Sequence, residues 1–188
     1  MARTKKQSIH YVDNKQFLAA MIDYKQECRQ CEEQGQESPP LPDYIGECFM
    51  KIAERLSFRP NFVNYAFREE MIADGIENCV QYAYNFDTDK SKNPFSYFTQ
   101  IIYFAFVRRI QKEKKQLYIK YKTIQDQSLL SDNVDVSEHD SRSFNYETLT
   151  EEQKANMYDF MHSFEASKKK KLKKATTNSL AAFITDEQ

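Results

Sequence analysis

Residues that break helices are rare in this chain, and their scarcity constrains its fold more than any other feature. Only three Gly and five Pro occur in 188 residues, while Lys, Glu, Gln and Ala fill long stretches without turn clusters. Breaks occur at Gly35 and the proline-rich segment 38–42, at Arg59-Pro60-Asn61, in a polar loop over 87–93 and in a loose, acidic, Ser-rich stretch over 123–150. The segments between them have helical periodicity, so we expect an all-α protein with one compact helical bundle.

Apolar residues recur at helical spacing in five segments. These segments are 13–33, 43–58, 62–85, 94–122 and 151–164. Asp13 and Asp43 are expected to be N-caps, because a carboxylate accepts hydrogen bonds from free N–H groups of the first turn. Pro94 suits the first turn of the fourth helix, where the N–H that proline lacks has no helical partner.

The predicted organisation has four parts. They are an N-terminal helix and linker over 1–42, a helical domain over 43–122, an acidic linker with a short helix over 123–165, and a flexible basic tail over 166–188. Charge is sorted in the same way: residues 95–122 hold seven basic residues and one acidic residue, whereas residues 123–152 hold eight acidic residues and one basic residue. Such sorting favours partners of different charge.

No catalytic or metal-binding constellation is evident. Cys28 and Cys31 have CxxC spacing, but no second Cys or His pair follows at zinc-finger distance, and His10, His139 and His162 are scattered. We therefore expect no enzyme, no metal and no cofactor. No apolar run approaches the roughly 20 residues that span a membrane, and the N-terminus lacks a secretory apolar core, which predicts a soluble cytoplasmic protein without a membrane partner.

The fourth predicted helix carries more large side chains than one packed face needs. At about 100° per residue, one arc forms an apolar core face: Phe95, Thr99, Ile102, Phe106, Ile110 and Leu117. A neighbouring arc holds Phe98, Ile101, Ala105, Arg108 and Lys112, with Tyr97 and Phe104 at its edge. Either helices on both sides bury this element, or the second arc offers flat side chains to unstacked bases and basic side chains to phosphates.

Four short motifs occur here in a fixed order. They are Met71-Ile72-Ala73-Asp74-Gly75-Ile76-Glu77, Asn85-Phe86-Asp87, Phe95-Ser96-Tyr97-Phe98-Thr99 and Phe106-Val107-Arg108-Arg109-Ile110. Their order and spacing resemble region 2 of the sigma-70 family of promoter-specificity factors. The length of the chain, its lack of a region-4-like helix-turn-helix and its C-terminal segment are similar to the late-promoter sigma factors of T-even-type bacteriophages.

The resemblance implies that the fourth helix reads and melts a TATA-like minus-ten element of promoter DNA. Phe98 matches the aromatic that stacks on a flipped-out adenine, and Ile101 and Ile102 match paired tryptophans that wedge against the duplex. Ala105 and Arg108 match positions facing the upstream end of the element. The residues expected to bind DNA are Tyr97, Phe98, Ile101, Ile102, Phe104, Ala105, Arg108, Arg109, Lys112 and Lys115.

Acidic residues lie on one side of the third predicted helix, opposite an apolar stripe. Such carboxylates usually form a solvated face, and a metal-dependent nuclease would need more ligands converging on one point. The resemblance implies that this side binds the clamp coiled coil of the largest subunit of host core RNA polymerase. The expected contact residues are Glu69, Glu70, Ala73, Asp74 and Glu77.

An isolated apolar cluster lies in the polar C-terminal segment. Leu180, Phe183 and Ile184 either fold back onto the core or anchor in a pocket on a partner. The resemblance implies that they bind the DNA sliding clamp. A flexible tether to a clamp already on DNA would raise the local concentration of the protein.

These observations predict a sigma factor that directs bacterial core RNA polymerase to late phage promoters in the cytoplasm of the infected host. A separate late-transcription coactivator is a further candidate partner. One alternative is a nonspecific single-stranded-DNA-binding replication accessory protein with a clamp-binding tail. Another is a structural adapter in which every aromatic is core and only the tail binds a partner.

Overall fold

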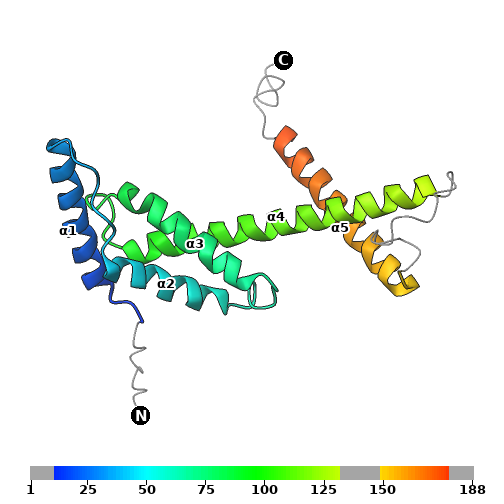
Figure 1. Ribbon diagram of the computed structural model, residues 1–188, viewed down its shortest axis with the longest axis horizontal. Helices are drawn as coiled ribbons and strands as arrows, with labels where there is room; N and C mark the ends of the chain where they lie inside the picture. The colour runs from blue at the N-terminus through cyan, green and yellow to red at the C-terminus, as the bar shows by residue number, and fades with distance from the viewer. Residues whose placement is uncertain (1–10, 132–148, 178–188) are drawn as a thin grey trace, which may run out of the picture. The chain divides into compact units, whose positions relative to one another are not determined.

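The computed structural model describes residues 11–131 and 149–177, and within these ranges it contains helices and no strand (Figure 1). The elements are α1 (Asn14–Glu33), α2 (Asp43–Ser57), α3 (Arg68–Tyr82), the 3-10 turn η1 (Ala83–Asn85), α4 (Pro94–Ser131) and α5 (Glu151–Thr177). The predicted all-α class is confirmed. None of the helices in the described ranges is long and apolar enough to cross a membrane.

The chain divides into two compact units, Met1–Ile110 and Gln111–Gln188, and the boundary falls inside α4. This differs from the predicted organisation, which placed 1–42 and 43–122 in separate parts. Phe17, Met21 and Cys28 of α1 are fully buried in the core that also contains residues of α2, α3 and α4. The first helix is therefore a structural part of the first unit, because its apolar side is covered by the rest of that unit.

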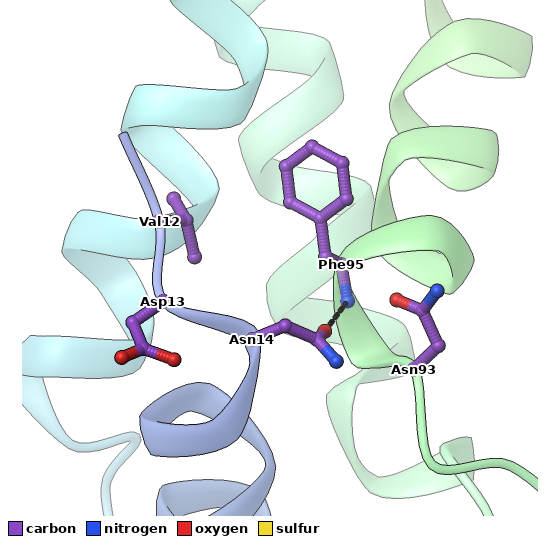
Figure 2. A pocket seen from close by; sticks show the side chains of 5 residues that line it. All are labelled: Val12, Asp13, Asn14, Asn93 and Phe95. Atoms are coloured by element: carbon purple, nitrogen blue, oxygen red, sulfur yellow. Dashed lines mark hydrogen bonds between the residues drawn. The ribbon is translucent and has the colours of Figure 1, made fainter. Parts of the chain in front are cut away.

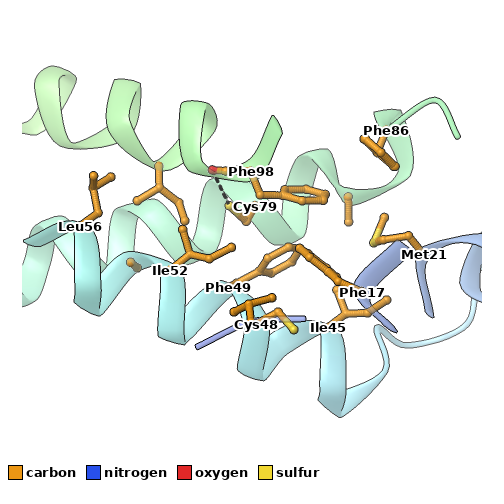
Figure 3. Close-up of a cluster of buried hydrophobic side chains, with 14 of the residues drawn as sticks. Phe17, Met21, Ile45, Cys48, Phe49, Ile52, Leu56, Cys79, Phe86 and Phe98 are labelled. Carbon is orange, nitrogen blue, oxygen red and sulfur yellow. Dashed lines mark hydrogen bonds between the residues drawn. The ribbon is translucent and has the colours of Figure 1, made fainter. Parts of the chain in front are cut away.

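Four phenylalanines meet at the centre of the first unit (Figure 3). They are Phe17, Phe49, Phe86 and Phe98, and all are 0% exposed. The ring of Phe98 lies 4.5 Å from that of Phe49, 5.6 Å from that of Phe17 and 5.9 Å from that of Phe86, measured between centroids. These distances fall in the range that aromatic pairs prefer, so elements far apart in the sequence are held by one aromatic cluster.

Gly75 allows α3 to approach α4 closely. A Cβ atom at this position would lie 3.0 Å from Cγ2 of Ile102 and 3.0 Å from Cε1 of Phe106. Phe106 is held edge-on by Phe62, with ring centroids 5.2 Å apart. The glycine of the Asp74-Gly75 motif thus has a packing role in this unit.

The ends of the first three helices agree only partly with prediction. Asp13 is confirmed as an N-cap, since its Oδ1 accepts hydrogen bonds from the N–H groups of Lys15 (2.8 Å) and Gln16 (3.5 Å). Asp43 is not a cap: it is the first residue of α2, and Pro42 at the cap position makes no side-chain cap bond. The third helix begins only at Arg68, because residues 58–67 form local turns that end α2 and bring Phe62 into the core.

The last two helices extend further than predicted. α4 continues to Ser131 and α5 to Thr177, whereas the expected ends were at 122 and 164. The described part of the acidic linker, 123–131, and the first part of the predicted flexible tail, 166–177, are therefore helical.

In the second unit, α5 crosses the C-terminal part of α4 (Figure 1). Tyr118 stacks on Phe164 with ring centroids 4.7 Å apart, and Tyr121 meets Phe160 edge-on at 5.7 Å. The hydroxyl of Tyr118 donates a hydrogen bond of 2.8 Å to Oε1 of Glu165. Residue numbers therefore rise along α4 as they fall along α5 at the point where the helices cross.

Candidate nucleic-acid interface

Side chains from two elements fix the start of α4 (Figure 2). Oδ1 of Asn93 accepts a 3.0 Å hydrogen bond from the N–H of Ser96, and Oδ1 of Asn14 accepts a 3.3 Å bond from the N–H of Phe95. The amide of Asn14 also donates to the carbonyl of Lys92 at 3.3 Å. Pro94 is the first helical residue, as predicted. The tip of α1 therefore holds the beginning of α4 in place.

A cavity of about 430 Å³ lies at this junction, lined by Val12, Asp13, Asn14, Asn93 and Phe95. Asp13 caps α1, and the two asparagine side chains are engaged in fixing α4. Because these polar groups already hold helix ends, we interpret the cavity as part of a structural junction and assign no ligand to it.

Three residues expected at the DNA surface are instead inside the core. Phe98 and Ile102 are 0% exposed and Ala105 is 2% exposed. Ile102 lies on the arc assigned to the core face, but the expectation that Phe98 and Ala105 face solvent is wrong, because α1 and α2 supply Phe17 and Phe49 to cover Phe98. Burial is therefore the correct alternative for Phe98 and Ala105, whereas Arg108 and Lys112 of the same arc are exposed.

Arg109 lies between α4 and α3. Its Nη1 is 3.2 Å from Oδ2 of Asp74, and the two side chains are only 20% and 33% exposed. Arg108, its neighbour, is exposed and donates a 2.7 Å hydrogen bond from Nη2 to Oδ1 of Asn78. Arg109 thus joins the two helices, while Arg108 remains at the surface.

Four of the expected DNA-binding residues form a surface strip on α4 in the first unit, which we call the outer stripe: Tyr97, Ile101, Phe104 and Arg108. Their spacing of four, three and four residues places them on one side of the helix. Phe104 is 49% exposed, Arg108 is exposed, and Tyr97 and Ile101 are half-buried. Lys112 and Lys115, which belong to the second unit, are exposed as well.

Tyr103 was not singled out from the sequence, although it is 39% exposed. Its ring packs edge-on against Phe62 at 5.6 Å and against Phe104 at 5.7 Å. A signal for it existed, since Ser96 and Gln100 precede it at helical spacing and mark the solvent side of α4. Together Tyr103 and Phe104 present two exposed rings, the kind of surface on which unpaired bases stack.

The acidic side of α3 is at the surface. Glu69, Glu70, Ala73 and Glu77 are exposed, whereas Asp74 is half-buried by its ion pair with Arg109. Val80, one turn further along α3, is 49% exposed and adds an apolar patch. We call Glu69, Glu70, Ala73 and Glu77 the acidic face; it suits a protein partner with basic side chains.

The remaining candidate groups contribute no further site in the described part of the chain. No cluster of three or more potential metal ligands occurs there. Cys28, Cys48 and Cys79 are buried free thiols, and burial raises the pKa of Cys79 to about 12. Leu180, Phe183 and Ile184, the expected clamp-binding residues, lie outside the described residues.

No protein-family model matches this chain, and no curated protein matches its sequence. Its functional assignment therefore rests on its residues and on the geometry of the two helices described above.

Proposed function

We propose that this chain is a promoter-specificity (sigma) factor that directs bacterial core RNA polymerase to late phage promoters. It recognises and melts a TATA-like minus-ten element, and the polymerase supplies the catalysis. The observation that carries the proposal is the outer stripe of α4, where exposed aromatic and cationic side chains lie outside a well-packed core. The acidic face of α3, in the same unit, gives a second surface, which is negatively charged.

On this proposal, bases contact the outer stripe rather than Phe98. Phe104 is accessible to a base that leaves the duplex, and Tyr103 beside it widens the stacking surface. Each base stacked on an aromatic ring contributes about 1–3 kcal/mol. Arg108 follows Phe104 by one turn and is placed to contact a phosphate.

The acidic face would bind the clamp coiled coil of the polymerase. Gly75 and the Arg109–Asp74 ion pair hold α3 against α4, so the two surfaces keep a fixed relation. Binding of polymerase through one surface would therefore place the other at the promoter. The C-terminal Leu180, Phe183 and Ile184 would connect the complex to the DNA sliding clamp, in the cytoplasm of the infected host and with a coactivator as a further partner.

Initiation by bacterial core polymerase tests the proposal. The purified protein is added to core polymerase on templates carrying a lone TATA-like element, with and without clamp, and strand opening is followed by permanganate reactivity of thymines. We expect opening with the wild-type protein and a loss of about tenfold or more for Phe104→Ala combined with Arg108→Ala, given the stacking energy above. The double change Glu70→Lys and Glu77→Lys should instead weaken binding to core polymerase.

A nonspecific single-stranded-DNA-binding accessory protein is the second candidate. The exposed Tyr103–Phe104 pair favours it, because rings stack on any base. Such a protein would bind mixed-sequence single strands as tightly as the minus-ten strand and would ignore polymerase. Absence of initiation on every template, linear or supercoiled, would contradict the sigma proposal, and absence of binding to single strands as well would favour the structural adapter.

A further inference from the structure

The second unit brings two distant lysine-rich segments to the same end of a helix pair. Tyr118 contacts Phe164 and Tyr121 contacts Phe160 where α5 crosses α4, so residue numbers rise along α4 as they fall along α5 at the crossing. Residues that precede Tyr118 on α4 therefore lie at the same end as residues that follow Glu165 on α5. The hydrogen bond from Tyr118 to Glu165 fixes this register.

Both segments at this end are basic. Residues 111–120 contain four Lys and one Glu, and residues 166–174 contain six Lys and no acidic residue. Lys114 and Lys115 precede Tyr118 by one turn, and Lys168 follows Phe164 by one turn. Because residues three or four apart share a helix side, these lysines extend the sides on which the two helices meet. We call the exposed set Lys112, Lys114, Lys115, Lys168, Lys169 and Lys170 the basic end.

Away from the basic end, two lysines in the described part of this unit form ion pairs. Lys122 is 3.5 Å from a carboxylate oxygen of Asp126, and Lys154 is 2.8 Å from one of Glu151, so lysines further along the pair have acidic partners within one turn. At the basic end, six lysines are accompanied by two acidic residues, Glu113 and Glu165, and Glu165 accepts the hydrogen bond of Tyr118. Gathering several like charges disfavours the folded pair unless an anion is bound.

We propose that the basic end binds the phosphate backbone of duplex DNA without regard to base sequence. Lysine is a flexible point charge that contacts phosphates and carries little sequence information. The nearest rings, Tyr118 and Phe164, are stacked on each other, so they offer no platform to unpaired bases and favour a duplex. The choice of DNA among polyanions rests on the proposed function, in which duplex flanks the melted element.

Duplex binding by the full chain, without polymerase, tests this inference. Fluorescence anisotropy is measured with a labelled duplex of mixed sequence that lacks any TATA-like element, over a range of salt concentrations. The variant carries Lys114→Gln, Lys115→Gln and Lys168→Gln. The control carries Lys51→Gln, Lys90→Gln and Lys122→Gln, which removes the same charge from side chains that are 48%, 86% and 46% exposed.

We expect the variant to lose affinity at low salt by at least about tenfold, and its plot of log K against log salt to become shallower by about 2–3 units, since each phosphate contact contributes about 0.9. The control should keep most of the affinity and slope. Arginine at the same three positions should preserve binding, and a circular dichroism spectrum identical to that of the wild type shows that all variants are folded.

Equal loss in variant and control, or no duplex binding by the wild type, would overturn the inference. Tighter binding to duplex RNA or to anionic vesicles than to duplex DNA would overturn it too, by assigning the basic end to another polyanion. This outcome is separable from that of the promoter experiment, because the duplex has no minus-ten element. The Phe104→Ala variant should bind this duplex as tightly as the wild type does.

Discussion

Gly75 and Gly46 are both helical glycines, yet the space around them differs. A Cβ at Gly75 would press on Ile102 and Phe106, both 0% exposed, whereas a Cβ at Gly46 meets nothing within 4 Å. The two positions therefore separate the packing effect of a methyl group from its effect on helix propensity.

We expect Gly75→Ala to lower the free energy of unfolding by up to about 2 kcal/mol, since overpacking costs about 1–3 kcal/mol and helix propensity returns about 1 kcal/mol. Gly46→Ala, the matched control, should raise stability by about 0.5–1 kcal/mol, because it gains propensity without a clash. Urea unfolding followed by circular dichroism measures both. A Gly75→Ala protein as stable as Gly46→Ala would show that Ile102 and Phe106 yield freely.

Burial of Cys79 predicts that the stability of the protein falls at high pH. Burial raises the pKa of the Cys79 thiol to about 12. The folded protein therefore keeps a proton that the unfolded chain releases near the ordinary thiol pKa of about 8.5. The unfolded state then binds fewer protons, and the contribution of Cys79 to stability is present below about pH 8.5 and is lost as pH rises towards 12.

Thiol reactivity measures this protection. At pH 8, Ellman's reagent should modify the half-buried Cys31 readily, and Cys79 only after unfolding in denaturant. Because Cys28 and Cys48 are buried too, Cys79→Ser should lower the number of thiols that react only after unfolding from three to two. Rapid modification of Cys79 in the native protein would mean that the core of the first unit opens on the time scale of the reaction.

At the scale of elements, one side of α4 packs in the core and another side is exposed. The side with Phe98 packs against Phe17, Phe49 and Phe86, and a neighbouring, exposed side carries Phe104. Sequence neighbours on this helix therefore serve stability or binding according to the direction in which they point. The ion pair and the glycine that join α3 to α4 make the two helices one platform.

Alanine substitutions on the two sides should separate the effect on stability from the effect on DNA binding. Phe98→Ala removes a fully buried ring and should cost about 3–5 kcal/mol of stability. Phe104→Ala, on the exposed side, should change stability by no more than about 0.5 kcal/mol while it weakens binding of unpaired DNA. Thermal unfolding and anisotropy with single-stranded DNA measure the two effects. If Phe104→Ala destabilised the protein as strongly as Phe98→Ala, its ring would be part of the core in solution.

At the scale of the whole molecule, the two units differ in how much apolar surface they bury. The first unit has a continuous core with contributions from α1 to α4. In the second unit the buried apolar side chains in the described residues are Ile124, Met157 and Met161, supported by the aromatic pairs between α4 and α5. Regions with few buried contacts open at a lower free energy than a large core.

Native-state hydrogen exchange should therefore show earlier exchange for the amides of α5 than for those of α2 and α3. Phe164→Ala should speed exchange in α5 and leave α2 and α3 unchanged, because the ring packs against Tyr118 and Phe160, both in the second unit. Mass spectrometry of peptides after timed exchange resolves the two units. Simultaneous exchange of α2, α3 and α5 would show that the units unfold together.

Local chemistry along the chain was sufficient to predict the helical class, the cap at Asp13, the start of α4 at Pro94 and the acidic surface of α3. These features depend on interactions within a few residues, or on charged side chains that stay in water in any fold. The start of α3 and the ends of α4 and α5 were less predictable, because Phe62 and the Tyr118–Phe164 contact draw adjoining segments into turns or helix through tertiary packing.

Only the tertiary structure decided which side of α4 is inside. Periodicity gives the angles between Phe98, Ile101 and Phe104, but the width of the covered arc depends on α1, whose Phe17 is 81 positions away from Phe98 in the sequence. In the same way, Asp74 and Arg109 each look like free surface charges until α3 and α4 meet and pair them. A sequence specifies which side chains share a face, whereas neighbours distant in the chain determine whether that face meets water.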